Sequence, residues 1–469
     1  MRKSVTESTI LFLSIIKWVF LASVAGAIVG GAVSLFLKIL NWSISFTAQS
    51  SQFFWLLPVS LFVSSLLVEY LAPDAEGHGT EKVIEAIHKR AGKIPLLVVP
   101  VKLVATLITL ALGGSAGKEG PCAQIGAGLT SLFSDLLRFD DDDRKKMVIC
   151  GISAGFASVF GTPIAGSIFG VEVLFVGAIM YEVLLPSFIA GIVAYQVSSS
   201  AGITYFHEPV SVIPVFSESF MIKVLLGGLF FGLCSIFLIE ILKLGENISK
   251  RLRIWKPAKG IVGGIGLVLL TYIFSMRYLG LGLDTVEASL HGVDTAWYAF
   301  LVKPLFTSLT LNFGGSGGIV TPIFFIGSTA GVSFAHILNL NAATFAAIGL
   351  VSVLAGSANT PIAASIMAVE LFGPAIAPYA TLSCVVSFLI TGHRSVYPSQ
   401  VLSISKSQSL RVEIGTEIEE IQTTLNLRQR GFVPRLLHLI ERLEKTVIKI
   451  QRAAISNSSN DKNGSGKKQ

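Results

Sequence analysis

VKLVATLITLALGGS, at residues 101–115, returns in the second half of the chain as VKPLFTSLTLNFGGS, at residues 302–316. A lysine, two threonines and the closing Gly-Gly-Ser occupy the same places in both copies. A second pair follows: TPIA occurs at residues 162–165 and at 360–363, and each copy leads to a Val-Glu that ends at Glu172 or Glu370. A duplicated apolar unit with a glycine-rich break and an intramembrane glutamate is typical of transport proteins. Their sites lie where broken helices of the two halves meet.

The composition is that of an integral membrane protein. Of the 469 residues, 52% are hydrophobic and only 14% are charged, whereas soluble domains carry about 25% charged residues. This excludes a soluble globule. We expect an all-α polytopic protein of the cell membrane, with its first membrane helix within residues 10–40, a stretch too long for the core of a signal peptide. Several apolar runs are shorter than the roughly 20 residues that cross a bilayer, which favours re-entrant or broken helices inside a bundle.

Apolar runs and loops divide the chain into four segments. We expect residues 1–200 to form the first membrane repeat and residues 201–403 the second. Residues 404–455 are predicted to form a cytoplasmic, basic, amphipathic helical tail, and residues 456–469 to be disordered. Basic residues before the first helix and along the tail place both termini in the cytoplasm by the positive-inside rule. The tail is expected to attract anionic membrane lipid, and no motif supports binding of nucleic acid.

The cysteines do not indicate a disulfide framework or a metal site. Cys122, Cys150, Cys234 and Cys384 form no CxxC pair and lie among apolar or small residues. We therefore expect them to act as small packing residues. No pairing of a nucleophile with a base is visible, so the sequence predicts neither an enzyme nor a cofactor.

The strongest candidate for a functional site is GKEGP, residues 117–121. Pro121 ahead of an apolar run indicates a helix start, where free N–H groups and the helix dipole favour anions. Glu119 is then an anion built into an anion site, which it can occupy, or leave when it is protonated or displaced. We predict that Glu119 is a gate and that Lys118 adds positive charge beside it. A nucleotide-binding P-loop is excluded because its spacing is not met.

Three further features would complete such a site. Residues 315–322, GSGGIVTP, keep the glycines and the proline of the first motif but not its charge. Two such helix starts facing each other would make one shared anion site. His78, in the glycine-flanked stretch at residues 77–79, could donate to an anion, although a histidine near the end of a loop is also a common surface residue. Tyr397 is either a hydroxyl donor or an aromatic anchor at the membrane interface.

Four charged residues stand inside apolar segments, where charge is costly unless it is paired or hydrated. Glu172 and Glu370 could relay protons, or could cap and pair. Their symmetric placement favours a structural role, and proton transfer stays open mainly for Glu172. Lys102 and Lys303 either provide positive potential near a pathway or pair with carboxylates.

Along the chain, the motifs at residues 77–79, 117–121 and 317–322 and the tyrosine at position 397 follow one another in an order that resembles the CLC family of chloride channels and chloride/proton antiporters. The resemblance covers about residues 75–400. The resemblance implies two inverted repeats of tilted and re-entrant helices, and a homodimer with one anion pathway in each subunit. It also implies that Glu119 is the gating glutamate. The anion-binding residues that it implies are His78, Gly79, Gly117, Lys118, Gly120, Gly318, Ile319, Val320 and Tyr397.

The chain departs from the family pattern around the anion. His78 stands where the family usually has a serine, and Thr80-Glu81 stand where Ile-Pro is usual. Val320 replaces a more usual phenylalanine. These departures leave the choice of anion open, with chloride expected and other small anions possible substrates.

A further departure bears on coupling. Val173 falls where antiporters of the family usually carry an internal proton-handling glutamate, and its channels commonly have valine there. We therefore favour a passive, channel-like chloride pathway that acid or depolarisation opens through Glu119. Chloride/proton exchange, using Glu119 and Glu172, is the alternative, and fluoride export, suggested by His78, is a third. A sodium-coupled transporter of organic anions would also use repeats and broken helices, but an anionic Glu119 argues against it.

Overall fold

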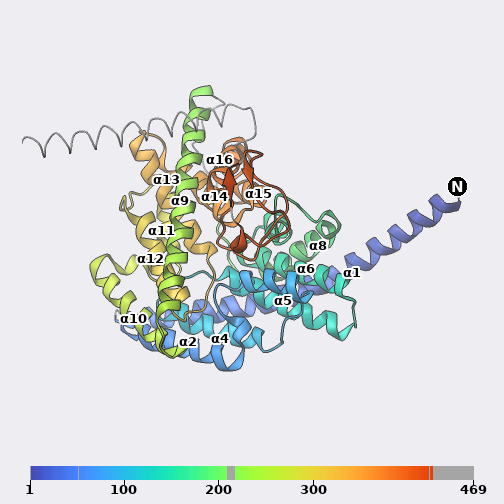
Figure 1. Ribbon diagram of the computed structural model, residues 1–469, viewed down its shortest axis with the longest axis horizontal. Coiled ribbons are helices and arrows are strands. Elements are labelled where there is room, and N and C mark those ends of the chain that lie inside the picture. The colour runs from blue at the N-terminus through green and yellow to red at the C-terminus, as the bar shows by residue number, and fades with distance from the viewer. Residues whose placement is uncertain (1, 51, 209–216, 422, 426–469) are drawn as a thin grey trace, which may run out of the picture.

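The computed structural model describes residues 2–50, 52–208, 217–421 and 423–425, and these are almost entirely helical (Figure 1). The helices of the first half are α1 (Arg2–Thr47), α2 (Leu57–Leu71), α3 (Thr80–Arg90), α4 (Val98–Ala111), α5 (Glu119–Leu136), α6 (Asp141–Phe160), α7 (Pro163–Glu172) and α8 (Tyr181–Ser200). Those of the second half are α9 (Glu218–Arg251), α10 (Lys256–Ile273), α11 (Leu283–Leu290), α12 (Ala299–Asn312), α13 (Val320–Ile337), α14 (Ala342–Ala358), α15 (Pro361–Phe372) and α16 (Ala377–Thr391). The two series run in the same order of long and short helices.

The helices that carry the duplicated sequence, α4 and α12, end in the same way. Gly113 and Gly314 adopt positive φ angles of 95° and 101°, a conformation that glycine reaches without a steric penalty. The next amide then turns back onto the helix. Gly114 donates to the Thr109 carbonyl at 2.8 Å, and the equivalent bond in the second half measures 2.9 Å. Each copy therefore leaves its helix sharply and reaches the next helix start within a few residues.

The repeated threonines and serines join the two halves. The Ser115 amide donates to the Thr310 hydroxyl at 2.9 Å, and the Ser316 amide donates to the Thr109 hydroxyl at 3.0 Å. Each half thus supplies the acceptor for the glycine-rich break of the other. The helix packing repeats as well, because α5 packs on α6 as α13 packs on α14, and α7 packs on α15. These reciprocal contacts relate the halves by an approximate two-fold axis.

The lengths of the helices match a protein that spans the membrane many times. In the described part of the chain, seven helices are long and apolar enough to cross a bilayer, and the first lies within Glu7–Thr47. The apolar helices α4, α14 and α15 are shorter. In α13, 89% of the apolar window is buried inside the protein, so its hydrophobic side chains pack on other helices. The prediction of short helices packed inside a bundle is confirmed.

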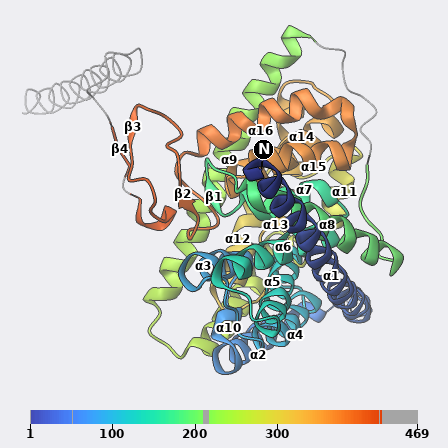
Figure 2. The same cartoon turned by 90° about the vertical axis from the view of Figure 1, so that its right-hand side faces the viewer.

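The predicted helical tail is wrong for the part that the structure describes. After α16 the chain forms β2 (Val401–Leu402), parallel to β1 (Phe175–Val176), and then β3 (Leu410–Arg411), antiparallel to β4 (Thr424–Leu425) (Figure 2). Ile418 packs on Val176 and Leu402, and its amide donates to the Gln400 carbonyl at 2.9 Å. The helical spacing of isoleucines is overridden here by docking on the first half. The remainder of the tail and the predicted disordered end lie outside the described residues.

Candidate anion site

Glu119 lies where helix starts from the two halves meet. α5 begins at Glu119 and α13 begins at Val320. Just before them, Gly117 and Gly318 exchange two backbone hydrogen bonds of 2.6 Å each. The two N-termini are therefore held next to each other, and their free N–H groups give this place a positive potential.

The carboxylate of Glu119 occupies the N-terminus of the opposite helix. The Thr321 amide donates to Oε2 at 3.2 Å, the Thr321 hydroxyl donates to Oε1, and the side chain is only 1% exposed. The carboxylate thus takes the kind of place that a free anion takes at a helix start. Gly117 makes room for it, because a Cβ atom there would lie 2.3 Å from Oε2. This is the arrangement expected of a glutamate that competes with an anion; its gating role stays a prediction.

Polar atoms without partners lie close to the start of α5. The Tyr397 hydroxyl, the Thr80 hydroxyl and His78 Nδ1 are buried and bond to none of the described residues. The rings of His78 and Tyr397 are 5.5 Å apart. Gly79 allows this loop to reach α5, since a Cβ atom there would lie 2.6 Å from the Gly120 carbonyl oxygen. Buried polar groups are nearly always paired in proteins, so these three atoms are available to a small polar ligand.

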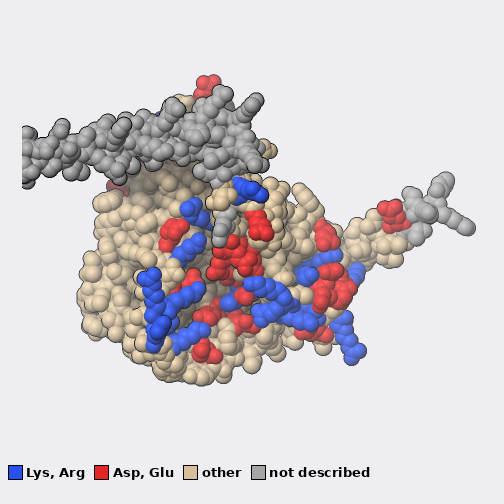
Figure 3. Space-filling view, in the orientation of Figure 1, with Lys and Arg blue, Asp and Glu red and all other residues tan. Residues whose placement is uncertain are grey.

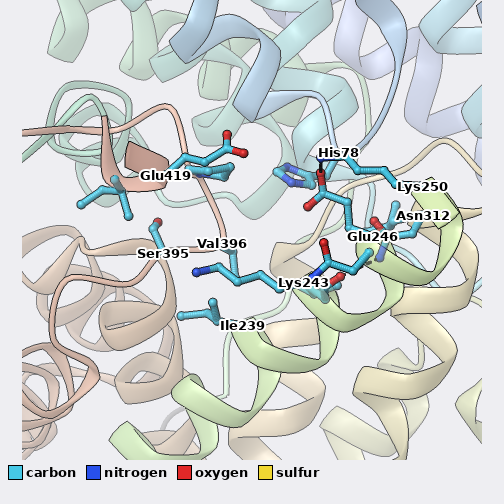
Figure 4. Close-up of a pocket in the computed structure, with 14 residues that line it drawn as sticks. His78, Ile239, Lys243, Glu246, Lys250, Asn312, Ser395, Val396 and Glu419 are labelled. Carbon is cyan, nitrogen blue, oxygen red and sulfur yellow. Dashed lines mark hydrogen bonds and ion pairs between the residues drawn. The ribbon is translucent and has the colours of Figure 1, made fainter. Parts of the chain in front are cut away.

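Two cavities lead from solution to His78. They have volumes of about 280 Å³ and about 550 Å³ and share His78, Glu246 and Lys250 as lining residues. Figure 4 shows the smaller one. We call them together the polar vestibule. Its charged and histidine lining residues are Glu76, His78, Glu81, Lys82, Glu85, Lys89, Lys243, Glu246, Lys250, Lys256, Lys259, Glu417 and Glu419. Charged side chains also gather in the middle of the face seen in Figure 3.

Among the remaining predicted site residues, Lys118 is the charged one, and it directly precedes Glu119. Ile319 and Val320 are buried. Lys118 is half-buried, and its ammonium group forms no ion pair with any residue that the structure describes. Thr321 was missed, although its place between Val320 and the proline of a helix start is a signal that could have indicated it.

The two intramembrane glutamates cap helices of the opposite half. Glu172 accepts the amides of Ile362 and Ala363, at 3.0 and 2.8 Å, at the start of α15. Glu370 accepts the two corresponding amides at the start of α7, also at 3.0 and 2.8 Å. A carboxylate at a helix N-terminus is stabilised by the helix dipole, so the interpretation of both as caps is confirmed. Val173, next to Glu172, is fully buried.

Lys102 and Lys303 also have matching roles, and of the two alternatives that the sequence left open, pairing with carboxylates is not found among the described residues. Lys102 donates to the carbonyls of Ala75 and Gly77 at 3.1 and 2.6 Å. Lys303 donates to two carbonyls in the equivalent turn before α11, both at 3.0 Å. Each lysine is buried at the end of a short 3-10 turn, where the chain exposes carbonyl groups without partners.

The apolar helices are those of a multi-pass membrane protein. Its site is suited to anion transport, because two helix starts meet there around a buried glutamate, with unpartnered hydroxyls nearby. The chain belongs to the CLC family, because the family described as voltage gated chloride channel matches residues 60–392. The prediction of a CLC-like fold of inverted repeats is confirmed, and the protein is a transport protein and not an enzyme.

Two relatives carry fluoride in their descriptions. A "chloride/fluoride channel protein" of Pseudomonas syringae pv. tomato is 37% identical over 401 residues, which cover 84% of this chain and 88% of the relative. The crystal structure of a CLC-type fluoride/proton antiporter matches with a TM-score of 0.80 at 30% identity, over 84% of this chain and 99% of the antiporter. A slow cyanobacterial Cl⁻/H⁺ antiporter shares the fold, with a TM-score of 0.71 at 20% identity, over 80% of this chain and 94% of that protein.

Proposed function

We propose that this protein carries fluoride across the cell membrane in exchange for protons, with Glu119 as both gate and proton carrier. The observation that carries this proposal is the Glu119 carboxylate bound to Thr321 at the start of α13. An anion can take that place only after the carboxylate has been protonated or displaced. Protonation of Glu119 and occupancy by an anion are thereby linked.

The choice of fluoride rests on the donors around the site and on the relatives. A small, strongly hydrated anion enters a dry site only where donors replace its water. His78, Thr80 and Tyr397 offer buried polar atoms without partners, and two hydroxyls and an imidazole N–H suit such an anion. The two relatives described above for fluoride support this choice over chloride, which the sequence alone had favoured. We also propose that the backbone of the glycines and apolar residues in the motifs at 117–121 and 315–322 binds the anion.

The test uses purified protein in liposomes, with a fluoride electrode, a pH electrode and valinomycin to set the voltage. We expect a fluoride gradient to drive protons uphill in the opposite direction, and a chloride gradient to do so much less. Glu119→Gln should still pass fluoride but lose the proton movement, while Glu182→Gln, in a surface ion pair at the start of α8, should keep both. Fluoride flux coupled to protons in Glu119→Gln would refute the role of this residue.

The second candidate is a passive chloride pathway, which Val173 favours because it cannot hold a proton. The same liposomes decide between the two. Chloride efflux that moves no protons, with fluoride left behind, would support the passive pathway and reject the exchange.

We further propose, from the family resemblance, that two copies form a homodimer with one pathway each and contact membrane lipid around it. The polar vestibule and both termini would face the cytoplasm. Accessibility of single cysteines placed at Lys250 and at Asp294, in a variant whose native cysteines are replaced, tests the orientation. Labelling of the Asp294 position from the cytoplasmic side would reject it.

A further inference from the structure

Glu81 is a carboxylate between the polar vestibule and the anion site. It is the second residue of α3 and lines the larger vestibule cavity together with His78. Its Oε1 accepts hydrogen bonds from the Ser399 amide, at 2.9 Å, and from the Ser399 hydroxyl. Its Oε2 is buried and has no partner among the described residues. One oxygen is therefore fixed, while the other is free to hold a proton.

Most of the lysines that line the vestibule are engaged by acids other than Glu81. The charged groups that share the larger cavity with Glu81 are Lys82, Glu85 and Lys89 of α3, Glu76 before α3, Glu246 and Lys250 of α9, Lys256 and Lys259 of α10, and Glu417 and Glu419 of the tail. Four of these lysines pair with glutamates other than Glu81, at 2.7 to 3.0 Å. Glu81 takes part in no ion pair within the described ranges, so its proton affinity is set mainly by its own burial.

Burial has a large effect on this group. It raises the pKa of Glu81 to about 7, against the hydrogen bonds from Ser399 and the charge of Lys82, which lower it. A carboxyl group that titrates near neutrality gains and loses its proton under ordinary conditions, as groups that handle protons must.

Tyr397 connects Glu81 with Glu119. The loop that carries Ser399, and so holds Oε1 of Glu81, also carries Tyr397 two residues earlier. Tyr397 is fully buried, and its ring lies 5.5 Å from the ring of His78, which lines the same cavity as Glu81. The Tyr397 hydroxyl is therefore placed to take part in a transfer from the vestibule to the anion site.

We propose that Glu81 is the residue through which protons pass between the polar vestibule and Glu119. This inference rests on the proposed fluoride/proton exchange. Oε2 of Glu81 gains an O–H bond from a hydronium ion of the vestibule water. That bond breaks when the proton passes, by way of water, to the carboxylate of Glu119, and Glu81 is again a carboxylate. One proton moves and no electron does, and fluoride crosses in the opposite direction.

Glu172, which the sequence had suggested for proton transfer, is not available for the task. Both oxygens of Glu172 cap the start of α15, and Val173 has no group that holds a proton. Glu81 alone among these residues combines access to the vestibule with a free carboxylate oxygen.

The test compares fluoride and proton fluxes of Glu81→Gln with those of the wild type in liposomes. The amide keeps the shape and an acceptor for Ser399 but takes up no proton. Proton transfer by a positioned side chain contributes about 100-fold or more to a rate, so we expect fluoride-driven proton uptake to fall by about that factor. Fluoride flux at a clamped voltage should persist. Glu182→Gln, which removes a carboxylate from a surface ion pair at the start of α8, is the control and should keep its proton uptake.

A second variant keeps the carboxylate and changes only its proton affinity. The Ser399 hydroxyl lowers the pKa of Glu81, so in Ser399→Ala the midpoint of proton uptake should shift to higher pH. A merely structural role would not move that midpoint.

The outcomes separate this inference from the proposed function. Wild-type coupling in Glu81→Gln would overturn the role of Glu81 and leave the exchange intact. A wild type that moves fluoride without protons would overturn both. If Glu81→Gln does not fold, Ser399→Ala decides, and an unchanged midpoint overturns the role of Glu81.

Discussion

Replacing Gly117 by alanine should expel the Glu119 carboxylate from the anion site. The backbone of Gly117 lies outside the left-handed region, so alanine is not strained there. Its Cβ atom would lie 2.3 Å from Glu119 Oε2 and 3.0 Å from the Thr321 hydroxyl oxygen. The carboxylate must retreat by about 1 Å to restore an ordinary contact distance. Its bond to the Thr321 amide, 3.2 Å in the wild type, then becomes too long for a hydrogen bond.

The expected size of the effect follows from the two bonds at risk. A hydrogen bond to a charged group contributes about 1.5–3 kcal/mol, and about 1.4 kcal/mol corresponds to a factor of ten in occupancy. Losing even one bond lowers the occupancy of the site by the carboxylate roughly 10- to 100-fold. A competing anion would then find the site free at neutral pH.

The assay is fluoride efflux from liposomes at acid and at neutral pH. The wild type should be faster in acid, because protonation releases the carboxylate, while in Gly117→Ala the two rates should converge. Gly31→Ala is the matched control, since nothing lies within 4 Å of a Cβ atom at Gly31. Undiminished acceleration by acid in Gly117→Ala would refute the reasoning. A variant that binds fluoride but does not transport it would refute it equally, by showing that the methyl group closes the path.

Two predictions concern stability. Glu172→Gln and Glu370→Gln each remove a charged acceptor from a helix start, and each should lower the free energy of unfolding by about 1.5–3 kcal/mol. Thermal unfolding in detergent measures this, and Glu182→Gln, whose surface ion pair contributes little, is the control; a wild-type unfolding temperature in either cap variant would contradict the prediction. Lys406 donates to the Asn359 side chain at 2.6 Å and to the Phe388 carbonyl at 2.7 Å. Lys406→Met should therefore speed proteolytic cleavage between α16 and β3 while transport continues, and unchanged resistance would show that these bonds do not hold the segment.

Much of the fold could be predicted because the duplicated residues are those that bind across the two-fold axis. Thr109 and Thr310 recur in the sequence since each accepts an amide of the other half. The tail could not be predicted in the same way. Its isoleucines have helical spacing, but Ile418 is placed by Val176 and Leu402, and no local pattern records a contact with so distant a segment.

In the candidate site, too, residues within a local motif could be predicted, and residues placed by distant contacts could not. Glu119 could be found because its charge and its glycines stand together in one short motif. Thr321 binds Glu119 from 202 positions away, and Ser399 binds Glu81 from 318 positions away. Neither partner has a local signature of that role. For Lys102 and Lys303 the sequence left open a carboxylate partner or an unpaired positive charge near the pathway, whereas carbonyl groups at the ends of turns accept their hydrogen bonds.

A comparison of the two halves distinguishes the backbone frame, which recurs in both, from the functional side chains, which occur in only one. The turn at Gly77, His78 and Gly79 has a counterpart at residues 280–282, where both glycines again have positive φ angles and a buried lysine again binds the turn. The frame is thus the same, but His78 is matched by Leu281. Since Gly117 pairs with Gly318, Glu119 is matched in the same way by Val320. Agreement between the halves therefore marks structure, and difference marks function. A second carboxylate at Val320 would repel Glu119 in a dry site and leave no place for an anion, so the exchange that we propose requires the duplicated frame to carry its charge on one side only.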